Sequence, residues 1–207
     1  MKHFSSAIRL LGIFSVGCGF IFPLCIWSIA QVVFPFQANG SFLTNEAGKQ
    51  LRSLLIGQNF SSPRYFHSRP SLAGSGYDAR TSGGSNLGPL SEKLRLGTFD
   101  NPDSTGVDES FTGFEGHASK YRAENGIPLD TLLPADAITY SGSGLDPDIS
   151  PANAYLQVAR ISGARNRSVA EINSLVKKYT QGRTFGLFGE PHVNVLALNL
   201  ALDEQAN

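Results

Sequence analysis

A long uncharged apolar stretch near the N-terminus most constrains what this chain can form. No charged side chain occurs between Arg9 and Glu46, and the residues that follow Arg9 are almost entirely apolar. The stretch exceeds the roughly 20 residues that a helix needs to cross the hydrocarbon core of a membrane. The sequence therefore predicts a short N-terminal segment (residues 1–9), one transmembrane helix (residues 10–36) and a polar domain behind it (residues 37–207).

Charged residues on the two sides of this helix indicate its orientation. Lys2 and Arg9 precede the span, whereas the flank after it is neutral until Glu46. Because positive residues stay on the cytoplasmic side, we expect the N-terminus inside and the polar domain outside. A cleaved signal peptide is the alternative, since residues 28–30 (Ser-Ile-Ala) resemble a cleavage site. The apolar run before that site is longer than the ~7–15 residues usual in a signal peptide, which favours an uncleaved anchor.

Composition narrows the class of the polar domain. Lys2 and Arg9 are two of the 17 basic residues and all 17 acidic residues follow the span, which leaves the domain with a net charge of −2. A nucleic-acid-binding protein shows a basic face, so this balance argues against nucleic acid as a partner. Cys18 and Cys25 both lie in the span, about 10 Å apart along a helix axis, too far for a disulfide. The domain must therefore be held by an ordinary core or by partners.

Capping residues and apolar spacing predict several helices after the span. The clearest begins at Pro151 behind Ser150 as N-cap, with Ala154, Tyr155, Val158, Ala159 and Ile161 facing inward. Ser168 and Glu171 form a capping box for the next helix, whose inward face carries Ile172, Leu175, Val176 and Tyr179. Three further helices are predicted at residues 44–55 (Thr44 as N-cap, Gly57 after its end), 90–96 and 119–125.

The sequence predicts two strands and one insertion in the domain. Residues 137–140 read as a short strand, and in residues 196–202 leucine alternates with alanine and asparagine, a period of two that favours a terminal strand. Residues 97–116 are rich in Gly, Asp, Ser and Thr, and we expect a surface insertion there. The sequence as a whole predicts a mixed α/β (α+β) domain with a small sheet behind one transmembrane helix.

A search for a catalytic or metal site finds only weak signals. Ser143 and Ser85 lack the Gly-x-Ser-x-Gly pattern of a nucleophile elbow, and Gly48-Lys49 lacks the first glycine of a phosphate loop. The histidines of the domain, His67, His117 and His192, are not at metal-ligand spacing, and Asp146 and Asp148 read as turn residues around Pro147. The glycine-rich loops could cradle an anion, but turns that need positive φ are the better explanation. We predict no catalytic residue and no metal ligand.

Several ordered motifs give the domain a family likeness. They are Tyr65–Ser71, Ser82–Pro89, Ser141–Pro151, Gln157–Arg160 and Gly189–Leu196. Together with the N-terminal anchor, they closely resemble the KdpC family, the C subunits of bacterial high-affinity potassium-transporting ATPases. The resemblance covers nearly the whole chain.

The resemblance implies an accessory subunit without catalytic activity, in the bacterial inner membrane with its domain in the periplasm. The implied partners are a channel-like potassium-binding subunit (KdpA), a P-type ATPase subunit phosphorylated on an aspartate (KdpB), a small peptide (KdpF) and membrane lipid. ATP and potassium are handled by the complex, and no tightly bound cofactor is implied for this chain. The family is also described as a catalytic chaperone that raises the affinity of the ATPase subunit for ATP.

The candidate nucleotide-contacting segment implied by the family is Ser82-Gly83-Gly84-Ser85-Asn86. The charge bias places this segment outside, whereas ATP is cytoplasmic, so direct contact conflicts with the predicted topology. Any effect on ATP affinity would then be a coupling through the membrane helices.

Polar residues in Gly/Pro-rich loops are the candidates for the interface with partners: Arg69, Asn86 and Asp146. An equally open alternative is that these residues hydrogen-bond their own turns. Two other functions stay open from the residues alone, namely a membrane-anchored periplasmic hydrolase using Ser143 or Ser85, and a binding or scaffold protein of an unrelated complex.

Overall fold

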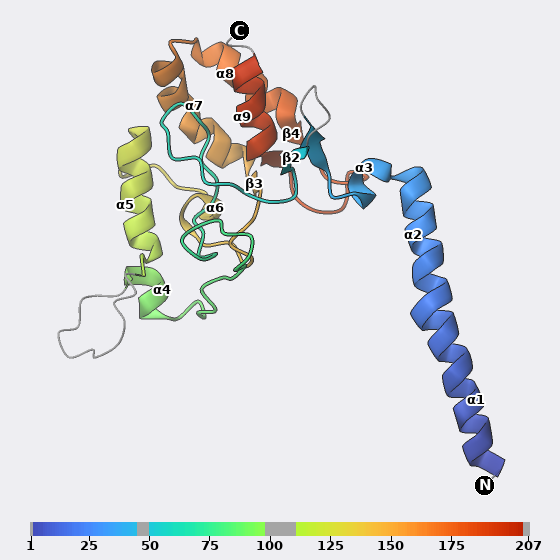
Figure 1. Cartoon of the computed structure of the whole chain (residues 1–207). Helices are drawn as coiled ribbons and strands as arrows, with labels where there is room; N and C mark the ends of the chain where they lie inside the picture. Colours follow the sequence, from blue (N-terminus) through green and yellow to red (C-terminus); the bar gives the residue numbers. More distant parts are fainter. Residues whose placement is uncertain (1, 45–49, 98–110, 205–207) are drawn as a thin grey trace. The chain divides into compact units, whose positions relative to one another are not determined.

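The computed structural model describes residues 2–44, 50–97 and 111–204, and the chain divides into two compact units, Met1–Leu54 and Leu55–Asn207 (Figure 1). The first unit holds the apolar helix and a β-hairpin, and the second holds the remaining helices and a small sheet. The predicted limits at residues 9 and 36 concern the membrane and stay a prediction.

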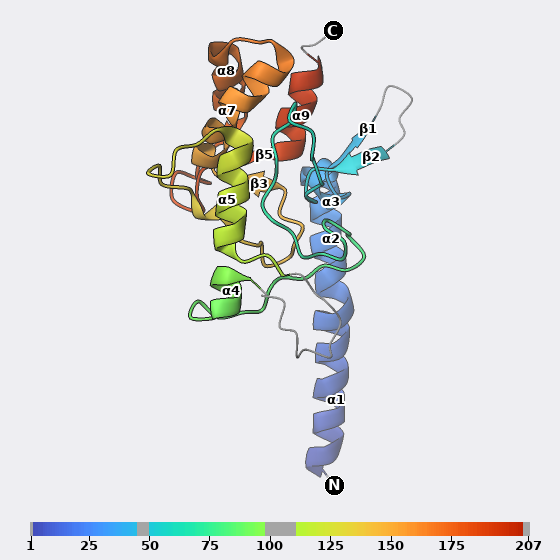
Figure 2. The ribbon, with the colours of Figure 1, turned by 90° about the vertical axis from the view of Figure 1, so that its left-hand side faces the viewer.

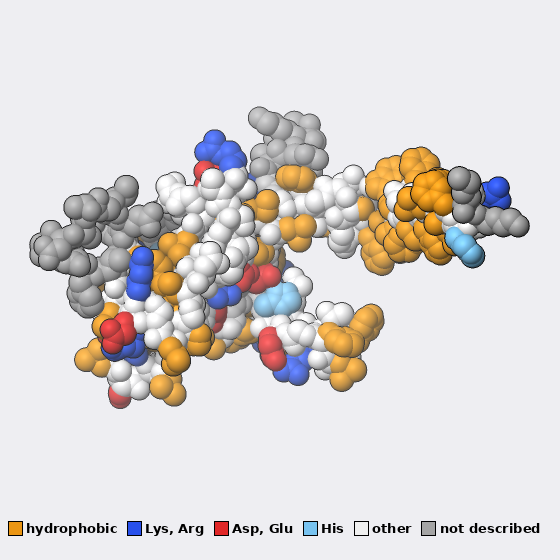
Figure 3. All heavy atoms as spheres, turned by 90° about the horizontal axis from the view of Figure 1, so that it is seen from below, with side chains coloured by type: hydrophobic (Ala, Val, Ile, Leu, Met, Phe, Trp, Pro, Cys, Tyr) orange, Lys and Arg blue, Asp and Glu red, His pale blue; other side chains and the backbone are white. Residues whose placement is uncertain are grey.

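The apolar stretch forms a helix long enough to cross a membrane. It comprises α1 (Lys2–Val16), a π-helical turn η1 (Gly17–Ile21) and α2 (Phe22–Val33). Over His3–Val33 the mean hydropathy is 2.1, and hydrophobic side chains surround the helix without being buried in the protein (Figure 3). An apolar surface of this extent is stable in a lipid environment. The predicted membrane-spanning helix is confirmed in length and character.

Pro23 is accommodated by the π-helical turn that precedes it. A proline inside a helix lacks the N–H donor, and its ring collides with the carbonyl four residues earlier. Here the Phe22 N–H bonds to Gly17 O, five residues back, which widens the helix directly before Pro23. The helix ends at Phe34 (φ −132°), where Pro35 disfavours the α conformation, and the short α3 (Pro35–Ala38) follows.

A β-hairpin, not a helix, follows the apolar helix. Strand β1 (Phe42–Thr44) pairs antiparallel with β2 (Gln50–Ser53), and Leu54 N donates to Ser41 O at 3.1 Å. The predicted helix over 44–55 is therefore wrong at both described ends, and its middle, residues 45–49, lies outside the described residues. Gly40 and Ser41, with φ of +89° and +50°, turn the chain into the hairpin, and strand pairing outweighs the helical spacing of a few apolar residues.

Gly57 has a packing role instead of the predicted role at a helix end. A Cβ atom there would lie 2.5 Å from the carbonyl oxygen of Asp146, closer than side chains tolerate. Its N–H donates to Leu145 O at 2.7 Å. Glycine at position 57 thus allows the second unit to begin with two backbones in direct contact.

The second unit packs three helices around one core, beside a three-stranded antiparallel sheet of order β3-β5-β4 (Figures 1 and 2). The helix α5 lies along α7. The mixed α/β class with a small sheet is confirmed. The elements are α4 (Glu92–Leu96), α5 (Phe114–Asn125), α6 (Ala135–Ile138), β3 (Asp148–Ile149), α7 (Pro151–Arg165), α8 (Val169–Tyr179), β4 (Thr180–Gln181), β5 (His192–Asn194) and α9 (Val195–Glu204).

The starts of α7 and α8 follow the capping residues. Ser150 Oγ accepts from Asn153 N at 3.1 Å, and Ser168 and Glu171 form the predicted capping box. The inward positions of α8 are confirmed, as are Ala154, Val158 and Ile161 on α7. Tyr155 and Ala159 are exposed instead, because α7 turns its polar residues Asn153 and Gln157 into the core.

Both predicted strands are helical in the structure. Residues 137–140 fall on α6 and its end, where Pro134 starts a helical turn. Residues 196–202 belong to α9, which buries side chains on several faces, including Leu196, Leu198 and Ala201. When a helix is buried almost all round, alternation along the sequence no longer distinguishes it from a strand.

The helix predicted at residues 90–96 is confirmed as α4, capped by Ser91. The helix predicted at 119–125 ends as expected at Gly126 but begins five residues earlier, at Phe114. Residues 114–116 of the predicted insertion are therefore helical, and most of the remainder, residues 98–110, lies outside the described residues.

A clasp of side chains holds the segment Pro63–His67, which leaves a turn at Pro63 and Arg64 and enters the core at Phe66. The amide of Asn199 on α9 accepts from Phe66 N (2.8 Å) and donates to Phe66 O (3.0 Å). The amide of Gln157 on α7 makes the same pair of bonds with His67, at 2.7 and 3.1 Å. Each amide therefore imitates the edge of a strand.

Two arginines of α7 complete the clasp. Arg160 donates to Pro63 O and Tyr65 O at 2.6 and 2.9 Å, and Arg165 donates to Arg64 O at 2.7 Å. Every carbonyl from Pro63 to His67 thus accepts a hydrogen bond from a side chain of α7 or α9. This satisfies a backbone that enters the core without a sheet partner.

Replacing Asn199 by Leu tests the clasp. The substitution leaves the N–H and C=O of Phe66 buried and unsatisfied, each costing about 1–3 kcal/mol. For a protein of this size we expect the melting temperature of the full chain in detergent to fall by roughly 5–15 °C, followed by circular dichroism. The control Tyr155→Phe, on the exposed face of α7, should melt like the unaltered chain. An Asn199→Leu chain of unchanged stability would contradict the role of the clasp.

Candidate functional site

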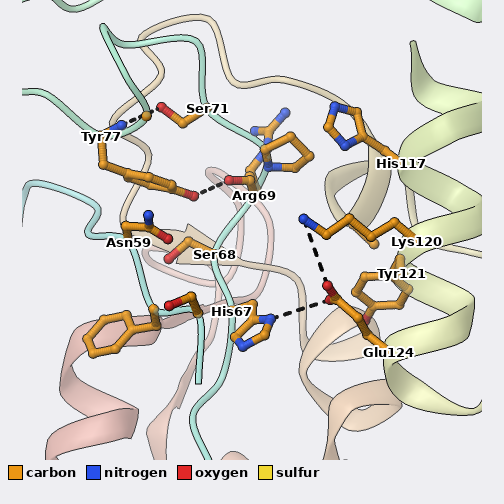
Figure 4. Close-up of a pocket in the computed structure, with 15 residues that line it drawn as sticks. Asn59, His67, Ser68, Arg69, Ser71, Tyr77, His117, Lys120, Tyr121 and Glu124 are labelled. Carbon is orange, nitrogen blue, oxygen red and sulfur yellow. Dashed lines mark hydrogen bonds and ion pairs between the residues drawn. The ribbon is translucent and has the colours of Figure 1, made fainter. Parts of the chain in front are cut away.

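The second unit contains a cavity of about 380 Å³ (Figure 4). It lies between α5 and residues 68–77, the segment that follows the clasp. The segment contributes Ser68, Arg69 and Tyr77 to one wall, and α5 contributes His117, Lys120 and Glu124 to the other. The remaining lining residues are Asn59, Phe60, Ser61, His67, Pro70, Ser71, Gly76, Tyr121 and Ala137.

Arg69 and Asp146, two of the predicted interface residues, are brought together by the fold. Arg69 Nη1 lies 2.8 Å from Asp146 Oδ2, and Arg69 Nη2 donates to Tyr140 O at 3.3 Å. Asp146 Oδ1 accepts from Asp148 N at 3.1 Å, and the carbonyl of Arg69 accepts from the Tyr77 hydroxyl. The Asp146 carboxylate therefore bonds its own turn, whereas the Arg69 side chain joins the cavity wall to the segment before β3.

The guanidinium of Arg69 keeps one unused donor. Its Nε is buried and has no hydrogen-bond partner among the described residues. Asn86, the third predicted interface residue, is exposed in the left-handed conformation (φ +52°) and does not line the cavity.

The segment Ser82–Gly84 packs on the loop Ser141–Gly144. Ser82 Oγ and Gly83 N both donate to Ser143 O at 2.9 Å, and a Cβ on Gly84 would lie 2.7 Å from Gly142 O. Positive φ is found at Gly144 (+69°) but not at Gly83 or Gly84, so the expected reason for those two glycines was wrong. Gly84 must be small because two backbones meet there, whereas a Cβ on Gly83 would meet no atom within 4 Å.

This packing affects what the two loops can bind. The Gly83 N–H already bonds to a protein carbonyl, so it is not available to a phosphate. Ser143 Oγ and Ser85 Oγ, the serines of the hydrolase alternative, accept from the N–H two residues later, at 3.1 and 3.5 Å. Both serines therefore act as turn residues.

Two histidines of the cavity, His67 and His117, have lowered pKa values, which favours their neutral form. Burial, followed by the positive charge of Arg160, lowers the pKa of His67, although Glu124 Oε2 lies 3.6 Å from its Nδ1. Burial and Lys120 lower the pKa of His117, which stacks edge-on against Tyr140. Burial also raises the pKa of Tyr77 to about 12.

The α5 wall of the cavity was not predicted from the sequence. His117, Lys120, Tyr121 and Glu124 stand at helical positions i, i+3, i+4 and i+7, and so share one face. The signal was present in the sequence, but a helix predicted to begin at Ser119 left His117 outside it. With Arg69 on one wall, and Lys120 and Glu124 paired at 3.9 Å on the other, the cavity can bind a small polar group by charge and hydrogen bonding. Within residues 2–44, 50–97 and 111–204, no group of three or more His, Cys, Asp or Glu is placed to hold a metal ion.

Two substitutions of Asp146 separate its charge from its hydrogen bonds. Asp146→Asn keeps an oxygen that accepts from Asp148 N but loses the charge that faces Arg69, and should lower the free energy of unfolding by about 1 kcal/mol. Asp146→Ala removes both contacts and should cost about 1–3 kcal/mol. Urea unfolding in detergent measures the difference. Equal losses in the two variants would show that the charge, not the turn, accounts for the whole effect.

The two histidines predict how stability depends on pH. Because both pKa values are lowered on folding, the unfolded chain binds protons more readily than the folded chain below the ordinary pKa of about 6.5. The free energy of unfolding should therefore be constant above this pH and decrease as the pH falls from 6.5 through the lowered values. The double variant His67→Gln/His117→Gln should show a flatter profile between pH 7 and 5. A slope that the double variant leaves unchanged would assign the pH dependence to other groups.

The comparisons with known proteins agree with the motifs. Residues 4–204 match the family described as KdpC: K+-transporting ATPase, c chain. A potassium-transporting ATPase KdpC subunit from Caulobacter vibrioides is 46% identical over 205 residues, covering 98% of this chain and 93% of the relative. Similar subunits from Mycobacterium tuberculosis and Gloeobacter violaceus are 46% and 43% identical, covering 95% and 98% of this chain and 95% and 96% of those proteins. The chain therefore belongs to the KdpC family, the C subunits of the potassium-transporting ATPase.

Proposed function

We propose that the chain is the non-catalytic accessory subunit of an ATP-driven potassium uptake complex. The family match from residue 4 to residue 204 carries this proposal, since it includes both the anchoring helix and the second unit. The proposed partners are the channel-like subunit KdpA, the P-type ATPase subunit KdpB and the small peptide KdpF. The phosphorylated aspartate of the reaction cycle would lie on KdpB.

The proposed location is the bacterial inner membrane, with the N-terminus in the cytoplasm and the second unit in the periplasm. The support comes from Lys2 and Arg9, which precede the helix, and from the absence of a charged residue after it until Glu46. A tag after Asn207 that is labelled only from the cytoplasm would contradict this orientation.

The proposed effect on ATP affinity is indirect. In this orientation Ser82–Asn86 and ATP are on opposite sides of the membrane, and the Gly83 N–H is already used within the second unit. A change in nucleotide affinity would then be a coupling free energy between two states of the complex, carried by the membrane helices. Assembly is the primary role that we assign to the chain.

Removing the anchor tests this function. The tagged full chain, purified in mild detergent from cells that express the complex, should recover a channel-like and a P-type ATPase subunit with potassium-stimulated ATPase activity. A chain that begins at residue 37 should fold but recover neither, because most of its contact with the membrane subunits is lost. Activity is compared in eluates of equal protein content, with the full chain carrying Tyr155→Phe as control.

Two results would contradict the proposal. Full ATPase activity with the chain that begins at residue 37 would show that anchoring is not part of the function. Recovery of the full chain without any ATPase subunit, from membranes in which that subunit is present, would argue against assembly with the pump.

A further inference from the structure

The loop between β4 and β5, residues 182–191, presents three large apolar side chains to solvent. Phe185 is 90% exposed, Leu187 74% and Phe188 66%. In the space-filling view the loop projects from the second unit, with hydrophobic side chains at its tip beyond one acidic and one basic side chain (Figure 3). Single exposed apolar residues are ordinary, but three at one turn form a patch that indicates binding. Phe185, Leu187 and Phe188 are called the apolar tip below.

The apolar tip is held in a fixed shape. Thr184 and Phe188 exchange two backbone hydrogen bonds, of 2.9 and 3.0 Å, which close the turn. At its base, Arg183 Nη2 lies 2.7 Å from both carboxylate oxygens of Glu190. An ordered turn loses little conformational entropy on binding, so the tip is prepared for contact.

Phe185 adopts an unfavourable backbone conformation at the tip. Its φ is +54°, a region that bulky side chains rarely occupy. Residues kept in such conformations cluster at binding and catalytic sites. Here the conformation leaves the aromatic ring in solvent, where it contributes nothing to the core.

Hydrogen bonds connect the base of the loop to the first residues of the second unit. The strands β4 and β5 belong to one sheet with β3, and Val195 N donates to Pro147 O at 3.0 Å. Gly57, the third residue of the unit, bonds to Leu145 just before β3. The base of the loop therefore lies in the same sheet, β3-β5-β4, that is joined to the first residues of the second unit.

Within the first unit, the last residue, Leu54, is held near the end of the membrane-spanning helix. Leu54 N bonds to Ser41 O, so the chain returns after the hairpin to a residue only three positions beyond α3. The second unit thus begins within a few residues' reach of the end of the apolar helix. A bilayer that contains this helix is therefore an apolar surface to which the second unit is tethered by a short length of chain.

We propose that the apolar tip inserts into the interfacial layer of the same membrane that the N-terminal helix spans. Aromatic side chains favour this layer, and a few inserted side chains suffice because the helix already supplies the anchoring. Arg183 and Glu190 neutralise each other at the base, so charge does not oppose the approach to a bilayer. A stable protein interface needs about 1,200–2,000 Å² of buried surface, far more than three side chains provide. The proposal does not depend on the function assigned above.

Depth-dependent quenching tests the insertion in the full chain. Trp27 is the single tryptophan, so Trp27→Phe provides a background without tryptophan fluorescence. In this background Phe185→Trp places a reporter at the tip, and Tyr155→Trp places a control on the exposed face of α7. Both chains are reconstituted in phosphatidylcholine–phosphatidylglycerol vesicles with lipids brominated near the headgroups. We expect roughly twofold quenching and a blue-shifted emission for Phe185→Trp, and neither change for Tyr155→Trp.

Three results would overturn the proposal. Emission from Phe185→Trp that is as unquenched as that of the control would place the tip in water, and a second reporter, Phe188→Trp, guards against a local effect of one substitution. Equal quenching of both reporters would mean that the whole unit rests on the membrane without a specific role for the loop. Loss of partner subunits from Phe185→Ser/Phe188→Ser in detergent, where no bilayer is present, would assign the tip to a protein surface instead.

Discussion

The second unit depends on the two buried amides that bind the backbone of Phe66 and His67. Asn199 and Gln157 are 1% and 0% exposed, and each offers one donor and one acceptor in the spacing of a strand edge. Without them, the segment Pro63–His67 would bring unsatisfied N–H and C=O groups into the core, which folded proteins avoid. The segment thereby joins α7 to α9 and leads directly into the cavity wall that begins at Ser68.

Local chemistry made part of the fold predictable. Ser150 with Pro151, and Ser168 with Glu171, set the starts of α7 and α8 through contacts within a few residues, and such contacts can be read from sequence. The apolar helix was equally clear, because a long run without charge has few alternatives. The clasp could not be predicted, since Asn199 and Phe66 are 133 positions apart and an isolated asparagine gives no sign of its partner.

Several of the errors arise because tertiary contacts override a local sequence pattern. Leucines in α9 alternate with smaller residues, but the helix is buried on several faces, so the alternation carried no information about a strand. Gly84 looked like a turn residue, whereas its lack of a side chain permits a second loop to pack on it. Of the candidate site, Arg69 and Asp146 were found as polar residues in rigid loops. Their pairing and the α5 wall opposite needed the fold itself.

The hairpin closes where Leu54 N bonds to Ser41 O. The number of residues in the hairpin is therefore independent of the route that the chain takes from α3 to the second unit. The residues between Ser41 and Leu54 form a side branch of the chain, because the pairing of β1 with β2 brings Leu54 back to Ser41. The hydrogen-bonded route from α3 through Ser41 to Leu54 does not pass through the branch. A change in the length of the branch would therefore leave unaltered the route by which the chain passes from the first unit into the second.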